Sequence, residues 1–293
     1  MPLFTRVIFW LWFAGLVTLV AGLFAARKSI SSARGLEKVI ALGPIFFAVP
    51  LAVFGAEHFT IARSIAQMVP PWMPAHLFWA YFVGVALLSA GLGIALRVTH
   101  ARLLAILLGI MFIGFVLMIH FPNAVANPHN RIFWTLVFRE LAFAGGAFAL
   151  AATHTKPLRI VARVFVAVPL IFFAVEHFLH PEFVPGVPLE KLTPAWVPLP
   201  VFLGWLTGAA LLIAGAAMLV DTKRARFAAT LLGALLTLLV LFLYLPIFLT
   251  DGPPVLLEGI NYVADTLLFA GTVLLAAAIM PGEVIGRISS TSS

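Results

Sequence analysis

Nine long apolar runs divide this 293-residue chain. A helix of about 20 apolar residues crosses the hydrocarbon core of a bilayer and satisfies its own backbone polar groups there. The runs lack the alternation of a barrel strand, and 63% of the residues are hydrophobic while only 10% are charged. We therefore predict an all-α integral membrane protein with helices at 7–26, 39–59, 76–96, 103–121, 132–152, 159–179, 200–220, 227–247 and 258–280.

The chain repeats itself after the first run. VPLAVFGAEHF at 49–59 recurs as VPLIFFAVEHF at 168–178, and PPWMP at 70–74 returns as PAWVP at 194–198. The first pair is 119 residues apart and the second 124, so the second copy has five more residues in its connecting loop. Each copy holds four predicted helices, an even number, and the copies therefore cross the membrane in the same direction. We predict two parallel four-helix bundles related by a pseudo-twofold axis.

The repeat also predicts how the chain is divided. The expected units are an extra N-terminal transmembrane helix at 1–30, a first repeat at 36–155, a second repeat at 156–282 and a disordered tail at 283–293. A site formed where two such repeats meet receives residues from both copies.

Basic residues gather in alternate loops. Most of the 18 Lys and Arg residues lie at 27–38, 97–102, 156–163 and 223–226, which fall on one side of the predicted bundle. Loops rich in Lys and Arg stay in the cytoplasm. We predict a protein of the bacterial inner membrane with its N-terminus outside and its C-terminus in the cytoplasm. The net charge of +7 reflects this topology, and we expect no nucleic-acid partner.

The sequence carries no recognisable catalytic motif. It has no cysteine, so disulfides and iron–sulfur clusters bound by its own thiolates are excluded, and any electron transfer must use a bound group. The eight histidines show no tight ligand spacing, so we expect no metal and do not favour a haem. No phosphate-binding glycine loop or nucleophile elbow occurs, and enzymatic activity is left open.

A Glu-His pair ends the first helix of each repeat. Glu57 and His58 in the first copy correspond to Glu176 and His177 in the second. Ionisable groups at membrane depth are costly, which favours a role in ligand binding. The alternative is that the pairs lie at the interface and fix the shape of the proline-rich loops.

Three further charges lie within the fourth helices of the two repeats, two in the first copy and one in the second. The LAFAG and LLFAG segments align Arg139 with Asp265, and Glu140 is the neighbour of Arg139. We predict that Arg139 and Asp265 are partners across the repeat interface or that they pair with acidic residues of their own bundle. They form either a structural ion pair or, as we favour, part of an outward-opening cavity that also includes the repeat glutamates. We expect Glu57 and Glu176 to approach each other there, with Arg139 near one of them and one acid neutral at pH 7.

The longer, proline-rich loops lie on the predicted outer face. Trp72 and Pro74 in the first copy, and Trp196 and Pro198 in the second, suggest caps at the membrane interface. Tryptophan prefers the headgroup level, and proline stiffens an extended segment.

The chain resembles the DoxX-like family of four-helix bacterial membrane proteins. The motifs are EHF, MVPPWMP, GVALLSAGLGIAL, RVTHAR and HFPNAVANPHNR in the first copy, and EHFLHPEF, TPAWVP, GAALLIAGAAMLV, DTKRAR and YLP in the second. The resemblance covers about residues 39–280 as two tandem domains. It implies four-helix bundles and an association with membrane redox processes, including the small subunit of a thiosulfate:quinone oxidoreductase. The lack of cysteine argues against sulfur chemistry on this chain.

These observations lead to one principal hypothesis of function and two alternatives. The first is a protein that binds a small hydrophobic or quinone-like ligand, or a lipid, between its repeats as an auxiliary to membrane redox metabolism. It would lie in the bilayer beside another membrane or periplasmic redox subunit. The alternatives are a transporter or channel for a small solute or proton, and a scaffold subunit of a larger complex.

Overall fold

The computed structural model describes residues 3–152, 155–220, 224–250 and 256–281. These residues are almost entirely helical, and their one β-bridge joins Phe183 and Leu192. The long helices are α1 (Leu3–Ser32), α2 (Glu37–Thr60), α4 (His76–Ala95), α5 (Ala101–Phe115), α7 (Arg131–Ala151), α8 (Lys156–Leu179), α9 (Pro200–Val220), α10 (Ala225–Leu239) and α12 (Leu256–Ile279). The short elements are α3 (Ala62–Ile65), a 3-10 turn (Ala66–Met68), α6 (Phe121–Ala126), α11 (Leu245–Thr250) and the π-helices η2 (Val116–His120) and η3 (Val240–Tyr244).

Nine helical stretches in these described residues are long and apolar enough to cross a membrane. They coincide with the nine predicted runs, so the prediction of an all-α membrane protein is confirmed. The proposed repeat boundaries stay a prediction, and the tail at 283–293 lies outside the described residues.

The third helix of each half continues beyond its predicted end. The expected ends at residues 121 and 247 were too early, because the helices run on to Ala126 and Thr250. In each case a π-helix precedes a proline, Pro122 or Pro246. A proline lacks the backbone N–H that an interior helical residue donates to a carbonyl one turn earlier. A π-helix shifts the hydrogen bonds of the preceding turn by one residue, and we infer that this shift lets the helix continue past the proline.

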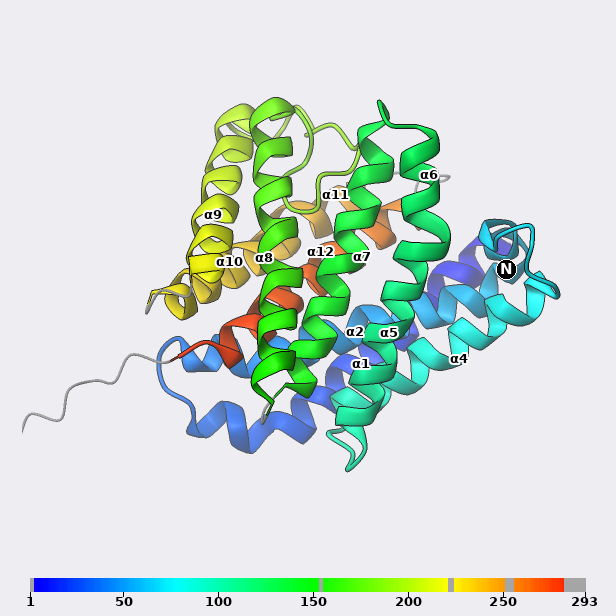
Figure 1. The fold of residues 1–293 in the computed structure, drawn as a ribbon, viewed down its shortest axis with the longest axis horizontal. Helices are drawn as coiled ribbons and strands as arrows, with labels where there is room; N and C mark the ends of the chain where they lie inside the picture. Colours follow the sequence, from blue (N-terminus) through cyan, green and yellow to red (C-terminus); the bar gives the residue numbers. More distant parts are fainter. Residues whose placement is uncertain (1–2, 153–154, 221–223, 251–255, 282–293) are drawn as a thin grey trace, which may run out of the picture.

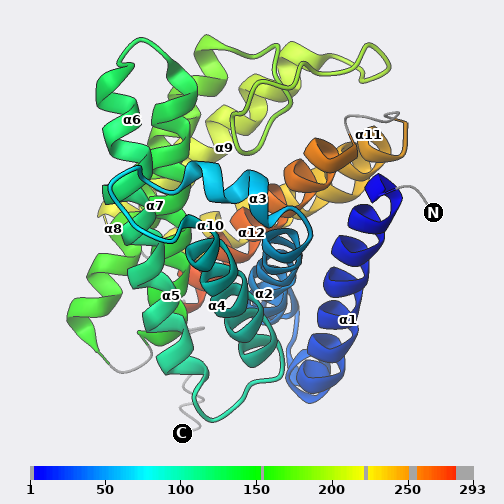
Figure 2. The ribbon, with the colours of Figure 1, turned by 90° about the vertical axis from the view of Figure 1, so that its right-hand side faces the viewer.

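The helices of the two halves form a closed ring (Figures 1 and 2). Following neighbours around it, the order is α2, α4, α5, α7, α8, α9, α10, α12 and again α2. The fourth helix of each half therefore packs on the first helix of the other half, α7 on α8 and α12 on α2. The helices α7 and α12 also contact each other across the ring, and α1 packs outside it on α2.

Small residues allow the central helices to approach closely. A side chain added at Gly271 of α12 would collide with the backbone of Phe47 in α2, and one at Gly146 of α7 would lie 2.7 Å from the Thr272 hydroxyl of α12. Such glycines are typical of close helix contacts in membranes. The centre of the molecule is therefore built by α2, α7 and α12.

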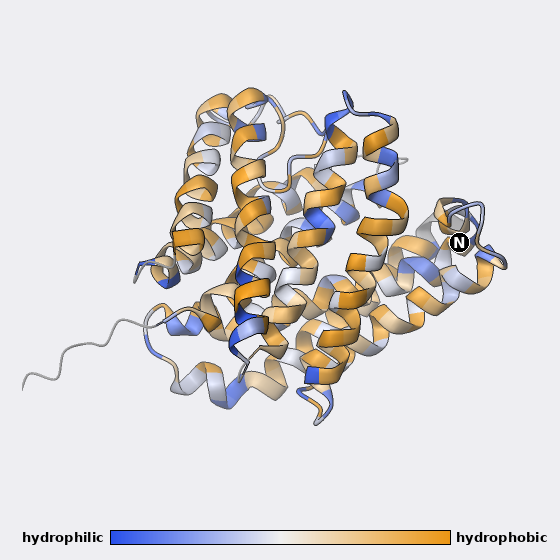
Figure 3. Ribbon diagram, in the orientation of Figure 1, coloured by the Kyte–Doolittle hydropathy of each residue, from blue (hydrophilic) through white to orange (hydrophobic). Residues whose placement is uncertain are grey.

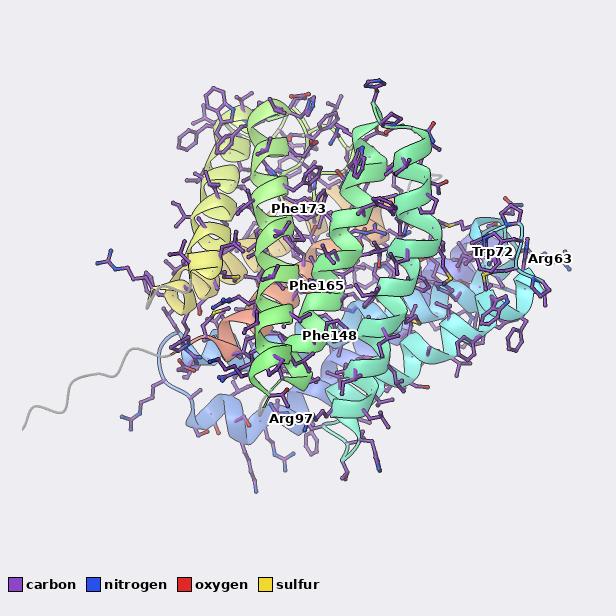
Figure 4. All side chains as sticks on the ribbon, in the orientation of Figure 1. Arg63, Trp72, Arg97, Phe148, Phe165 and Phe173 are labelled. Atoms are coloured by element: carbon purple, nitrogen blue, oxygen red, sulfur yellow. The ribbon has the colours of Figure 1, made fainter. Side chains whose placement is uncertain are left out.

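The surface separates into an apolar belt and polar ends. Figure 3 shows hydrophobic colours along the outer flanks of the helices and hydrophilic segments at their ends and inside the bundle, near α7 and α12. Arg63 and Trp72 lie beyond one end of α4, and Arg97 lies beyond the other (Figure 4). This pattern is expected of helices that cross a bilayer.

Candidate functional site

Arg139 on α7 forms the centre of a buried polar cluster. Its Nη1 donates to Asp265 Oδ2 at 2.9 Å, and its Nη2 donates to Glu140 Oε1 at 2.8 Å. Both carboxylates are buried. The predicted pairing of Arg139 with Asp265 is confirmed. From the helix rise, both residues lie about 12–14 Å beyond the start of α7 or α12, well inside the hydrocarbon core.

Glu57 on α2 joins the same cluster through an asparagine. Asn261 Nδ2 donates to Glu57 Oε1 at 3.0 Å, and Asn261 lies one turn from Asp265 on α12. The charges of Asp265 and Arg139 both act on Glu57 at this distance. Asn261 Oδ1 is buried without a hydrogen-bond partner. Asn261 was not among the predicted site residues, although its position one turn before Asp265 places it on the same face of the helix.

Glu176 has a different partner from Glu57. Arg131 Nη1 donates to Glu176 Oε2 at 3.1 Å. The same guanidinium donates to carbonyls of the loop between α8 and α9 and lies 4.3 Å from the ring centroid of Phe183. The sequence indicated only that Arg131 is a charge on the outer side. The structure therefore places the two repeat glutamates in different polar clusters. Glu57 belongs to the cluster around Arg139, and Glu176 is paired with Arg131.

The two motif histidines share one hydrogen bond and differ in another. His58 Nδ1 lies 2.7 Å from Phe54 O, and His177 Nδ1 lies 2.6 Å from Phe173 O. In the second half, Gly186 N also donates to His177 Nε2 at 2.9 Å. No comparable loop contact to His58 occurs among the described residues.

The π-helices place two further buried residues beside the charges. His120 ends η2 and Tyr244 ends η3, at matching positions 124 residues apart. The charge of Arg139 acts on His120, and that of Asp265 acts on Tyr244. π-helical turns are frequent at functional sites. The sequence already aligned His120 with Tyr244, because each lies two residues before the proline that the two copies share, Pro122 or Pro246.

Buried acids outnumber the arginines that are bonded to them. Two arginines, Arg131 and Arg139, are bonded to three of the four buried carboxylates, and the fourth has an amide partner. The buried acids are Glu57, Glu140, Glu176 and Asp265. Two negative charges would be uncompensated if all four were ionised. Burying such charges is costly, so this arrangement favours bound protons or a ligand that donates hydrogen bonds.

The predicted interfacial caps lie at exposed positions. Trp72 is 70% exposed and Trp196 is 50% exposed. Pro74 accepts a hydrogen bond at its carbonyl from Trp79 Nε1 at 3.0 Å, while Pro198 shortly precedes α9. These residues lie at helix ends and away from the charged cluster. They are therefore candidates for an interfacial cap and are separate from the ligand site.

The described residues enclose two hollows. An apolar groove of about 440 Å³ lies between α1, α2 and α4, and its lining includes Trp10, Ala56 and Leu88. A polar hollow of about 650 Å³ lies at the N-terminal end of α7, and its lining includes Arg131 and Glu190. Within the described residues, no group of three or more His, Asp or Glu side chains has an arrangement suited to a metal ion.

Comparison of the chain with protein-family models, curated proteins and solved structures finds no match in any of the three.

Proposed function

We propose that this integral membrane protein binds a small hydrophobic or quinone-like molecule against the polar cluster between its halves, as an auxiliary to membrane redox metabolism. The observation that carries the proposal is the excess of buried carboxylates in the Arg139 cluster, where Glu57, Glu140 and Asp265 accompany one arginine. Ionisable groups inside a membrane protein are costly to bury, so their presence favours a functional role. The resemblance to DoxX-like proteins supports the same redox setting.

The residues of the cluster suit the polar ring of such a ligand. Asn261 Oδ1 is a buried acceptor without a donor, which a ligand hydroxyl would supply. The guanidinium of Arg139, which donates to Asp265 and Glu140, is also suited to a carbonyl oxygen of the ligand. Glu57 is an acid without a bonded cation. A quinone-like ligand supplies two-electron chemistry when bound, while these side chains orient it and hold protons.

An apolar groove outside the ring provides a second surface for a lipid chain. It has a volume of about 440 Å³, lies between α1, α2 and α4, and is lined almost wholly by apolar side chains. Ligand pockets commonly have volumes of about 300–1,000 Å³. Electrons would come from a partner subunit, because the chain has no cysteine to hold an iron–sulfur cluster.

Mass spectrometry of protein purified with native lipids tests the proposal. We expect about one quinone or lipid molecule per chain, and a roughly tenfold lower content in Asp265→Asn, because this change weakens the bond that positions Arg139. The control is Glu182→Gln on an exposed loop position, which should bind as the parent does. An empty parent, or equal content in all three proteins, contradicts the proposal.

A proton-linked transporter is the second candidate, and Glu57 is the observation that favours it. Glu57 is bonded to an amide and lies beside another acid, so protonation relieves a buried charge there. Acids between repeats suit alternating access. Vesicles with the reconstituted protein should acidify in response to a proton gradient, and Glu57→Gln should abolish that flux. Absence of flux in the parent protein removes this candidate.

We also propose that the protein lies in the bacterial inner membrane with its N-terminus outside. The support is the distribution of basic loops, since Arg34 and Arg97 lie at the helix ends opposite the caps. In this orientation the polar cluster faces the outer half of the bilayer.

A further inference from the structure

The loop between α8 and α9 turns inward and buries its middle. Residues 184–188, with the sequence VPGVP, are all buried, and Val187 is only 1% exposed. Figure 1 shows this loop descending between α8 and α7. The matching loop at 61–75 forms α3 and a 3-10 turn and stays largely accessible. The inward turn accounts for the five extra residues of the second copy.

His177 binds the tip of this loop in a way that requires a neutral ring. Its Nδ1 donates to Phe173 O at 2.6 Å, and its Nε2 accepts from Gly186 N at 2.9 Å. A ring nitrogen that accepts a hydrogen bond carries no proton. Gly186 has φ 136°, a conformation that favours glycine, so the loop is shaped to present this N–H.

Two further side chains hold the loop from other helices. Tyr244 donates its hydroxyl to Pro185 O at 3.0 Å. Arg131 donates to Pro188 O at 3.1 Å and to Leu189 O at 2.9 Å. Buried backbone carbonyls need such donors, and the prolines reduce the number of N–H groups that need acceptors. The loop is therefore held by these hydrogen bonds together with the packing of Val184 and Val187 into the main hydrophobic core.

We propose that residues 184–188 form a gate over the Arg131–Glu176 pair, closed by neutral His177 and opened when His177 takes up a proton. A proton on Nε2 sets two donors against each other, His177 N–H and Gly186 N–H, and breaks their hydrogen bond. Release of the loop also frees the carbonyls bound to Arg131. The polar hollow of about 650 Å³ already reaches Arg131, and opening of the loop extends this hollow to Glu176, which does not line it in the closed arrangement.

The charges around His177 set how readily the gate opens. The charge of Arg131 acts on His177, and the neighbouring Glu176 is bonded to Arg131. The helix α9 carries no titratable residue. The titratable groups of the other elements are Arg139 and Glu140 on α7, Tyr244 on η3, Glu258, Tyr262 and Asp265 on α12, and His180, Glu182, Glu190 and Lys191 in the loop. Because a proton on His177 breaks the hydrogen bond from Gly186, a more acidic solution favours opening.

Thiol labelling measures this opening directly, because the chain has no cysteine of its own. Val187→Cys reports the buried tip, and Leu192→Cys, at a site 62% exposed in the same loop, corrects for the pH dependence of the reagent. We expect the ratio of their maleimide rates to rise at least about tenfold between about pH 8 and about pH 5, as a lost hydrogen bond favours local opening. An unchanged ratio overturns the gate.

Two variants and one control show whether His177 is responsible. His177→Gln keeps an acceptor for Gly186 but gains no proton, so its ratio should stay low at every pH. Tyr244→Phe removes the bond to Pro185 and should raise the ratio at every pH, which keeps the test available if His177→Gln does not fold. An equal rise with pH in His177→Gln, or no rise in Tyr244→Phe, refutes the proposal. Ala162→Cys, buried in α8, should stay unreactive, and its labelling would mean general unfolding and contradict a local gate.

Discussion

Replacing Arg139 with methionine should destabilise the protein strongly. The change removes the cation bonded to Glu140 and Asp265 and leaves both carboxylates inside the bundle. Removing one partner of a buried pair costs about 3–5 kcal/mol. At about 2–4 °C of melting temperature per kcal/mol, the melting temperature should fall by roughly 6–20 °C. The seven tryptophans allow unfolding in detergent to be followed by intrinsic fluorescence.

Two companion variants test the reason for this loss. Glu176→Gln keeps an acceptor for Arg131, which also lines a polar hollow and bonds two loop carbonyls, so its cost should be about 1 kcal/mol. Adding Asp265→Asn to Arg139→Met should recover part of the stability, since an amide replaces an unpaired carboxylate. An Arg139→Met protein that melts like the parent, or no recovery in the double variant, would refute the account of the cluster.

Three other changes have expected outcomes. Gly271→Ala forces a methyl group against the backbone of Phe47 and should cost about 1–3 kcal/mol, whereas Gly114→Ala meets only a flexible methionine side chain and should melt like the parent. Asn261→Ala removes the donor to Glu57 and should lower stability by about 1–3 kcal/mol, and an unchanged melt would show that the bond is dispensable. A fluorescent protein fused to the C-terminus should be bright in the cytoplasm, and a dark, exported fusion would reverse the proposed topology.

The sequence could predict the helices and one ion pair, because both depend on patterns that repeat along the chain. Continuous apolar runs of membrane-spanning length leave few alternatives to helices. The pairing of Arg139 with Asp265 followed from the repeat alignment, since residues at matching positions lie at the same depth.

The rest of the site depends on contacts that no local pattern contains. In the sequence, Arg131 is only a charged residue in a predicted loop. Its contact with Glu176 depends on the packing of α7 against α8. The five extra residues of the second loop were visible, but their inward path depends on partners in three helices. The passage of the third helices beyond Pro122 and Pro246 depends on the π-turns, which hydropathy does not reveal.

The most direct test of the central claim is a cryo-electron microscopy map of the protein in its native lipids, at a resolution that shows side chains. We predict non-protein density at the polar cluster, within hydrogen-bonding distance of Asn261 Oδ1 or the Arg139 guanidinium. A cluster closed by protein side chains alone, with no additional density between the halves, would contradict ligand binding at this site.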